Sequence, residues 1–383
     1  MAVYDFRLPA IIRVGAGSHL TLPDAALHLG KRILVVSDRN CAAIPEVAAT
    51  IEALADRAES LVRFLDVPGE PTTAEIAAGL QSMATLGLED AGSVRPVVVG
   101  IGGGSVLDTA KAIAAMATNP GSIVDYVGRD RLVNPRLPLV LAPTTAGTGS
   151  EATRYTVITD PITNVKMLIT DWSLLPDVAV IDPLFVVGSP RSVTASAGVD
   201  ALTHAIEAYV SQRHQPTADL FALGAIRDLY PHLVAAWEDG KNIVARTATL
   251  TGALHAGIAF SNASVALVHG MSRPIGAYFH VAHGLSNAML LPEITAWSLA
   301  TAPDRYGAIA QAMGLASPAD IPEALSALSR RLEIPRLGAV IDAEKLRALA
   351  PQMARDALAS GSPANNPRVP TEAEMVDLYH RCL

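Results

Sequence analysis

Short apolar runs alternate with longer amphipathic stretches through the first half of the chain. Residues 31–38, KRILVVSD, are nearly continuously apolar, which is typical of a strand buried on both faces of a parallel sheet. Similar runs lie at 61–65, 96–101 and 137–143, with helical periodicity at 42–58 and 73–86. Because strands and helices alternate, we predict an α/β domain with a mostly parallel sheet built from βαβ units.

After about residue 186 the periodicity becomes helical and stays helical. Few strand-like stretches occur there, and short Pro or Gly connections separate the helical ones. We therefore predict an α/β domain over residues 1–185 and an all-helical domain over residues 186–383. The predicted helices of the second domain cover 193–211, 215–237, 242–261, 285–300, 303–313, 321–332, 343–360 and 371–381.

The composition excludes several classes of protein. Of the 383 residues, 50% are apolar and 17% charged, which is ample material for two cores. A net charge of −8 without a basic run argues against nucleic-acid binding. No secretory signal and no uncharged apolar run of about 18 residues is visible, so we expect no membrane span. The two cysteines, Cys41 and Cys382, make no disulfide framework, which favours a cytoplasmic location.

Three consecutive glycines, Gly102, Gly103 and Gly104, separate an apolar run from an Ala-rich helical stretch. A strand, a glycine loop and a helix N-terminus together bind phosphate, because backbone N–H groups converge and the helix dipole favours an anion. The full G-x-G-x-x-G fingerprint is absent, since Ser105 stands at its last glycine. A tight structural turn is the alternative interpretation.

A second loop, PTTAGTGSE at 143–151, also follows an apolar run. Two such loops can lie on either side of one pyrophosphate at the carboxyl edge of a sheet, although a polar surface loop is the alternative. The hydroxyl side chains that we expect to contact the cofactor are Thr144, Thr145, Thr148 and Ser150. Asp38, at the end of the run at 31–38, is predicted to accept hydrogen bonds from ribose hydroxyls and to repel a 2′-phosphate, which favours NAD over NADP. Its alternative role is that of a turn residue.

Four residues of the second half form a candidate metal site. Asp200 and His204 lie four residues apart and therefore on one helical face. One Pro and two Gly between His269 and His283 are expected to break a helix and to bring this second pair back to the first. One carboxylate and three imidazoles suit Fe²⁺ or Zn²⁺ with a position open for substrate. Any single histidine could be a satisfied core residue, and His280 is a reserve ligand.

With these motifs placed, the chain resembles the iron-containing (group III) alcohol dehydrogenases, a family related to glycerol dehydrogenase and dehydroquinate synthase. The resemblance lies in GGGSVLDTAKAI at 102–113, PTTAGTGSE at 143–151, DALTHAIE at 200–207 and HGMSRPIGAYFHVAHGLSNA at 269–288. It implies a dehydroquinate-synthase-like architecture, with an NAD(P)-binding α/β domain, a helical metal domain and an active site in the cleft between them. Homodimers or larger assemblies are usual in that family.

The resemblance also assigns roles to individual residues. The metal ligands of the family fall on the four residues chosen above, and its cofactor contacts fall on Asp38, Gly103, Gly104, Ser105, Asp108, Thr144, Thr145, Thr148 and Lys166. Two positions depart from the family pattern. Arg273 stands where many members have a histidine close to the nicotinamide, and arginine cannot shuttle a proton near neutral pH. Glu70 stands where many members have asparagine, near the nicotinamide ribose.

These residues lead to a hypothesis of function. We expect a metal-dependent alcohol dehydrogenase or aldehyde reductase that transfers a hydride between a primary alcohol and a nicotinamide cofactor, with Fe²⁺, or alternatively Zn²⁺, as Lewis acid. Arg273 suggests a substrate with an anionic tail, with an ion pair to a nearby acid as the equal alternative. Maleylacetate-reductase-like or hydroxyacid dehydrogenase activity is a second possibility, and a nucleotide- or metal-binding protein without turnover is a third.

Overall fold

The chain divides into two compact units, Arg7–Ser189 and Pro190–Leu383, and the N-terminal segment up to Phe6 groups with the second. The computed structural model describes residues 3–87, 95–162 and 165–383. Residues 1–2, 88–94 and 163–164 of the predicted first domain lie outside the described residues. The sequence pattern predicts the domain boundary after residue 185 and assigns the N-terminal segment to the α/β domain. The segment groups with the helical unit because apolar side chains anchor it there: Phe6 stacks on Phe221 with ring centroids 5.7 Å apart.

The unit Arg7–Ser189 is built on a six-stranded, wholly parallel sheet. In spatial order its strands are β1 (Ile11–Val14), β9 (Val178–Ile181), β6 (Leu139–Pro143), β4 (Val97–Gly102), β2 (Arg32–Val36) and β3 (Ser60–Phe64). The chain runs outward from β2 to β3 and then crosses back to place β4 on the other side of β2. Sheets of this kind bind ligands where the strand order reverses, outside the carboxyl ends of the strands. The fold thus points to the ends of β2 and β4.

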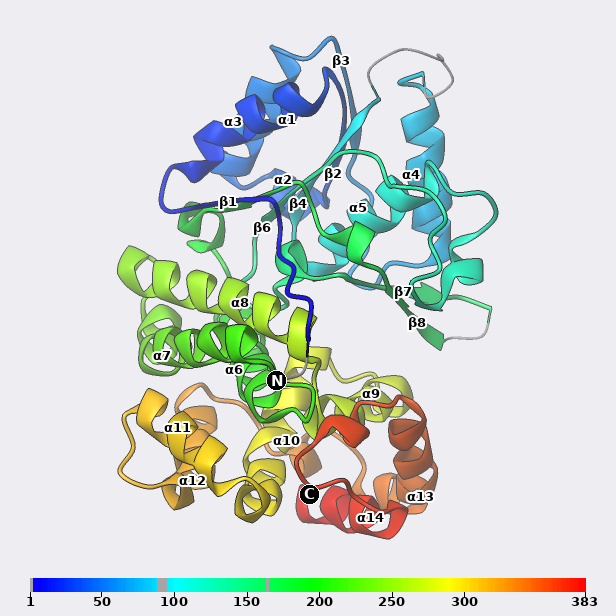
Figure 1. Cartoon of the computed structure of the whole chain (residues 1–383). Helices are drawn as coiled ribbons and strands as arrows, with labels where there is room; N and C mark the ends of the chain where they lie inside the picture. The colour runs from blue at the N-terminus through cyan, green and yellow to red at the C-terminus, as the bar shows by residue number, and fades with distance from the viewer. Residues whose placement is uncertain (1–2, 88–94, 163–164) are drawn as a thin grey trace. The chain divides into compact units, whose positions relative to one another are not determined.

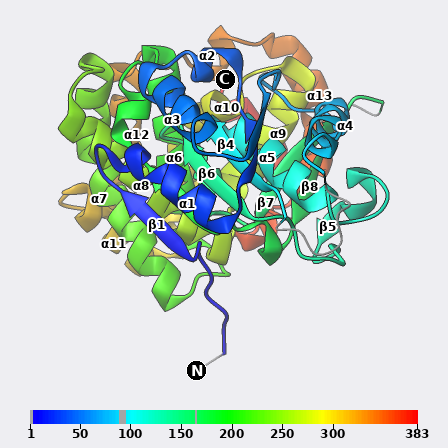
Figure 2. The same cartoon turned by 90° about the horizontal axis from the view of Figure 1, so that it is seen from above.

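Successive residues of each strand point to opposite faces of this sheet, and helices cover both faces (Figures 1 and 2). Ile33 and Val35 of β2 pack in one core with α1 (Leu22–Leu29) and α3 (Pro45–Ala55). Leu34 and Val36 pack in the other core with α4 (Thr73–Ala84) and α5 (Gly104–Met116). Burial on both faces explains why the strands are continuously apolar in the sequence. The remaining elements are α2 (Arg39–Ala42) and a second sheet of β5 (Gly128–Arg129), β8 (Val165–Thr170) and β7 (Tyr155–Asp160).

The unit that contains Pro190–Leu383 is all-helical in the described residues, as predicted. Its α-helices are α6 (Arg191–Val210), α7 (Pro216–Glu238), α8 (Ile243–Ala263), α9 (Leu267–Phe279), α10 (His283–Ser298), α11 (Pro303–Met313), α12 (Ile321–Arg331), α13 (Ala343–Ala359) and α14 (Glu372–Arg381). Among the described helices, α8 alone is long and apolar enough to cross a membrane, but 61% of that stretch is buried inside the structure, as in a core helix. The predicted combination of an α/β domain with an all-α domain is confirmed.

Helix α9 corrects one prediction. The Pro and the two Gly after His269 were expected to break the helix, yet α9 continues through Pro274 to Phe279. Leu267, Val268, Met271 and Ile275 are buried along it, and such tertiary packing outweighs the hydrogen bond that a proline removes. The helix ends instead at His280, which caps it in the left-handed conformation with φ 56°.

Gly284 sets the distance between α10 and α6. A Cβ atom at this position would lie 2.7 Å from the backbone oxygen of Ser196 and 3.2 Å from Cβ of Asp200, both in α6. The absence of a side chain therefore lets the first turn of α10 approach α6 closely.

We predict that Gly284→Ala lowers the free energy of unfolding by about 1–3 kcal/mol, because the added methyl group overpacks a backbone contact. Urea denaturation measures this. The matched control is Gly307→Ala in α11, where an added Cβ meets nothing within 4 Å. That substitution should leave stability unchanged or raise it by about 0.4–1 kcal/mol. Equal effects of the two substitutions would contradict the packing argument.

Candidate metal and cofactor sites

Three predicted metal-ligating side chains meet in the helical unit. Asp200 of α6, His269 of α9 and His283 at the start of α10 each bring one ligand-type atom into a group whose members lie within 4.8 Å of one another. Nε2 of His269 lies 3.6 Å from Oδ1 of Asp200. Asp200 and His269 are buried and His283 is exposed, so the group has a closed side and an accessible side.

His204 lies next to this group but not within it. Its ring is buried between two others, stacking on His269 with centroids 4.4 Å apart and on Phe260 with centroids 4.2 Å apart. The expected i, i+4 relation to Asp200 on α6 is present. The structure thus brings three of the four predicted ligands into one cluster and places the fourth against a member of it.

A carboxylate that the sequence argument did not single out, Glu207, holds His269 in place. Oε2 of Glu207 accepts a hydrogen bond of 2.6 Å from Nδ1 of His269. The same carboxylate accepts the backbone N–H groups of Val268, at 2.5 Å, and His269, at 3.4 Å, and so caps the first turn of α9. With Nδ1 committed to Glu207, Nε2 is the ring nitrogen that faces Asp200 and that can hold a proton or a cation.

This arrangement stabilises positive charge inside the helical unit. Burial opposes ionisation of Asp200, but the charges of His204, His283 and His269 and a hydrogen bond outweigh it and hold its pKa well below the usual range. Burial likewise lowers the pKa of His269, but Glu207 and Asp200 together raise it to about 9. A proton or a metal cation can supply the positive charge that these groups favour.

The donor set fits a divalent transition metal. Imidazole nitrogen and carboxylate oxygen are ligands of Zn²⁺ and of non-haem Fe²⁺, and a second carboxylate that fixes the imidazole tautomer is a common feature of such centres. Glu207 falls seven residues after Asp200 and three after His204, so helical spacing alone could have placed it on the same face. Asn287, one turn after His283, also contacts this group and was missed in the same way.

The predicted cofactor loops of the α/β unit meet at the carboxyl edge of the sheet. Thr144, after β6, donates its N–H to the carbonyl of Gly102, the last residue of β4, at 3.0 Å. Its hydroxyl lies 3.1 Å from the thiol of Cys41, which follows β2. Asp38 caps α2, where its Oδ1 accepts the N–H groups of Asn40 and Cys41 at 2.9 Å each. The ends of β2, β4 and β6 are therefore joined to one another.

The two loops are packed too closely to tolerate a side chain at Gly104. A Cβ atom there would lie 2.7 Å from Cγ2 of Thr148, and one at Gly102 would lie 2.6 Å from Val106. The N-cap of α5 is Gly103, which has no side chain to cap the helix. Ser105, in its first turn, donates its hydroxyl to the carbonyl of Gly69. The first turn of α5 thus keeps the backbone geometry that suits a phosphate.

Two charged side chains of α5, Asp108 and Lys111, bond to the chain in and after the second loop. Oδ1 of Asp108 accepts a 2.6 Å hydrogen bond from the hydroxyl of Ser150, and its Oδ2 accepts the N–H of Val157 at 2.8 Å. The fully buried Lys111 donates to both oxygens of Thr153 at 2.9 and 3.0 Å and to the carbonyl of Tyr155 at 2.9 Å. Asp108 and Ser150, predicted as cofactor contacts, thus hold the glycine-loop helix to the second loop.

The remaining predicted residues lie as follows. Lys166 forms a 2.6 Å ion pair with Glu70, the residue that departs from the family pattern. Arg273 is half-buried in α9, one turn after His269 and therefore on the same helical face. The reserve ligand His280 is exposed and is not a member of the cluster found among the described residues.

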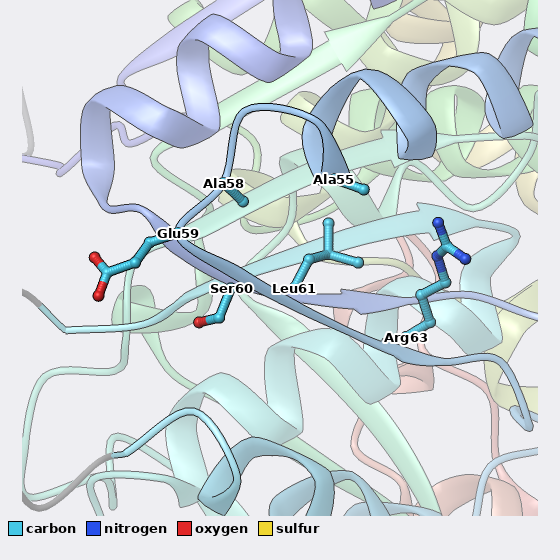
Figure 3. A pocket seen from close by; sticks show the side chains of 6 residues that line it. All are labelled: Ala55, Ala58, Glu59, Ser60, Leu61 and Arg63. Carbon is cyan, nitrogen blue, oxygen red and sulfur yellow. The ribbon is translucent and has the colours of Figure 1, made fainter.

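The α/β unit also has a surface hollow (Figure 3). It is lined by Ala55, Ala58, Glu59, Ser60, Leu61 and Arg63. The hollow extends along β3, from its first residue, Ser60, to Arg63, and Ala55 at the end of α3 also lines it. It contains none of the predicted site residues.

Glu151, in the second loop, gives a prediction of pH dependence. Burial raises the pKa of its carboxyl to about 7, and among the described residues its Oε2 accepts no hydrogen bond. An acid whose pKa is higher in the folded state binds its proton more tightly there. The free energy of unfolding therefore falls as the pH rises from the pKa of glutamate in the unfolded chain toward 7. At about 1.4 kcal/mol per pKa unit, the loss is on the order of 3 kcal/mol, and Glu151→Gln should remove it.

Denaturation of the wild type and Glu151→Gln between pH 4.5 and 7.5 measures this difference. Glu59→Gln, at an exposed carboxyl of the same unit, is the control and should retain the wild-type slope. If the free energy of unfolding of Glu151→Gln depends on pH as it does in the wild type, the raised pKa of Glu151 is contradicted.

Comparison with known proteins agrees with this geometry. The model of the iron-containing alcohol dehydrogenase family matches residues 9–183, and that of the C-terminal part of the Fe-containing alcohol dehydrogenase family matches residues 194–383. The 1,3-propanediol dehydrogenase of Citrobacter freundii is 34% identical over 390 residues, which cover 99% of this chain and 98% of that protein.

Solved structures show the same likeness. A crystal structure of 1,3-propanediol oxidoreductase aligns with a TM-score of 0.92 at 33% identity over 100% of both chains. That of sulfoacetaldehyde reductase from Bifidobacterium kashiwanohense in complex with NAD⁺ aligns with a TM-score of 0.89 at 26% identity, over 100% of this chain and 99% of that one. The predicted dehydroquinate-synthase-like fold is confirmed, and the chain belongs to the iron-containing alcohol dehydrogenase family.

Proposed function

We propose that this chain is a metal-dependent alcohol dehydrogenase that transfers a hydride between a primary alcohol and NAD, and that reduces the aldehyde in the reverse direction. The observation that supports this most strongly is the convergence of ligand atoms from Asp200, His269 and His283 within 4.8 Å. Membership of the family supports the reaction class. The similarity to a 1,3-propanediol dehydrogenase supports a small alcohol as substrate.

We assign the cation to Asp200, His269 and His283, with His204 as the fourth ligand because its ring already packs on His269. Fe²⁺ is proposed from the family, and Zn²⁺ is the alternative because the donor set suits both. When bound, the cation supplies Lewis acidity, which favours loss of the alcohol proton and polarises the carbonyl in the reverse reaction. Glu207 holds Nδ1 of His269, so Nε2 is the ring nitrogen available to the cation in place of a proton, while the exposed His283 lies where substrate can enter.

We assign NAD to the α/β domain, predicted over residues 1–185, and the metal to the helical domain over residues 186–383. The proposed contacts of the pyrophosphate are Gly102, Gly103, Gly104, Ser105, Thr144, Thr145 and Thr148. Asp38 is proposed to face the adenosine ribose, where its charge disfavours the 2′-phosphate of NADP. Asp108 and Ser150 would shape the loops, and Lys166 would be held near the cofactor by Glu70. The NAD⁺ complex of the similar sulfoacetaldehyde reductase supports this choice of cofactor.

Location and assembly are part of the same proposal. Cys41 and Cys382 are both free cysteines, which suits the reducing cytoplasm. A homodimer or larger homo-oligomer is proposed from the family resemblance alone.

We predict that Asp200→Ala removes the metal and nearly all alcohol-dependent formation of NADH. Outer partners of a metal centre typically contribute about 10–100-fold in affinity, so loss of a direct ligand should exceed about 100-fold. Metal analysis and NADH absorbance measure the two effects. The control is Asp377→Ala at a side chain of α14 that is 67% exposed. If Asp200→Ala turns over like the wild type in metal-free buffer, the ligand assignment is contradicted. If the wild-type protein binds NAD but shows no turnover, the non-enzymatic alternative is favoured.

Arg273 supports a second hypothesis, that the substrate carries an anionic tail. Arg273 follows His269 by one helical turn, and a guanidinium group presents a fixed fork that suits a carboxylate or sulfonate. The similar sulfoacetaldehyde reductase is named for a substrate of that class. Hydroxyacid dehydrogenase and maleylacetate-reductase-like activities are further anionic alternatives.

We predict that Arg273→Ala lowers kcat/KM for a hydroxy acid by about 10–100-fold, the value of one charged hydrogen bond, and changes that for propanol little. Steady-state assays of both substrates measure this. Arg273→Lys, which keeps the charge but not the fork, should recover part of the loss. An equal decrease for both substrates would contradict the anionic-tail hypothesis.

A further inference from the structure

We propose that Asn287 is a positioning residue whose amide group holds the metal-binding atoms in convergence before the cation binds. Its Nδ2 lies 2.6 Å from Oδ1 of Asp200, 3.1 Å from Nε2 of His269 and 3.2 Å from Nε2 of His283. One nitrogen thus contacts a ligand atom of each member of the three-residue cluster. This inference rests on the proposed function, since it concerns how the metal centre is prepared.

The packing of α10 against α6 places the amide of Asn287 close to the cluster. Asn287 follows His283 by one turn of α10, so both side chains lie on one helical face. Its side chain has no solvent exposure. The close approach of α10 to α6 at Gly284 brings this face against Asp200. The amide cannot turn to water, so its hydrogen-bonding groups must find partners within the helical unit.

The chemistry of the contacts fixes which end of the amide faces the cluster. The Asp200 carboxylate is an acceptor. Nε2 of His269 is also an acceptor when the ring is neutral, as it must be to take a cation, because Nδ1 then carries the proton that bonds to Glu207. An amide NH₂ group matches these acceptors, whereas the amide oxygen would repel the carboxylate. The oxygen, turned away, has no hydrogen-bond partner among the described residues. The contacts to the cluster therefore determine the orientation of this side chain.

The NH₂ group of Asn287 offers partial positive charge to the same three lone pairs that a cation would take. It has two hydrogens for three acceptors, so it satisfies the cluster less fully than an ion does. Without it, the buried Asp200 carboxylate would lose its 2.6 Å donor and the two imidazoles would lose a common neighbour. Asn287 thus orients the ligand atoms inward and gives way to the ion that they bind.

The test is Co²⁺ titration of metal-free protein against a competing chelator, with the visible ligand-field spectrum as a second readout. For Asn287→Ala we expect Co²⁺ affinity to fall about 10–100-fold, as for outer partners of metal ligands, with an altered spectrum. The matched control is Asn366→Ala, which removes a buried amide of the same unit that donates to Ser298 Oγ and to the carbonyl of Arg368. It should lower Tm without changing Co²⁺ affinity.

A second variant keeps the test informative if Asn287→Ala does not fold. Asn287→Asp places a carboxylate beside Asp200, so its metal-free Tm should fall and its Co²⁺-induced rise in Tm should exceed that of the wild type. Wild-type affinity and spectrum in the Ala variant, or a wild-type rise in Tm in the Asp variant, would overturn the role of Asn287. A wild type that binds no Co²⁺ would instead refute the proposed metal centre itself.

Discussion

The helical unit depends on one buried interaction, the hydrogen bond between Glu207 and His269. A carboxylate that is 2% exposed would be costly in a protein interior without partners, and here it accepts an imidazole N–H and two backbone N–H groups. The same contact begins α9, joins it to α6 and fixes the tautomer of His269. Positive charge is then favoured at Nε2, where Asp200 and His283 also point. One residue therefore both caps α9 and fixes the imidazole that we propose as a metal ligand.

The α/β unit offers backbone groups rather than a strong charge, and such groups suit the dinucleotide that we propose for it. Its parallel sheet brings the ends of β2, β4 and β6 to one edge, and Thr144 connects them. Small residues let the loops approach each other, while Asp108 and Lys111 tie them together from behind. These two charged side chains thus support the loops, and the loop backbones remain available to a ligand.

Much of this could be predicted from sequence, because periodicity depends on local chemistry. The strands buried on both faces were read as apolar runs, and α11 was predicted with its observed bounds at 303–313. Helix α9 was missed because Pro274 and two glycines oppose a helix locally, whereas its burial is a property of the tertiary structure. Glu207 and Asn287 were not predicted, because the spacing was applied to metal ligands and not to the residues that hold them. The stacked position of His204 and the pairing of Asp108 with Ser150 depend on side-chain packing that no spacing rule contains.

The most direct measurement is X-ray absorption at the metal edge of the metal-loaded wild-type protein. The account predicts a first shell of nitrogen and oxygen ligands at about 2.0–2.2 Å, with the outer scattering of imidazole rings and no sulfur. A sulfur shell at about 2.3 Å, or a first shell without imidazole scattering, would contradict a centre built from one carboxylate and histidines of α6, α9 and α10.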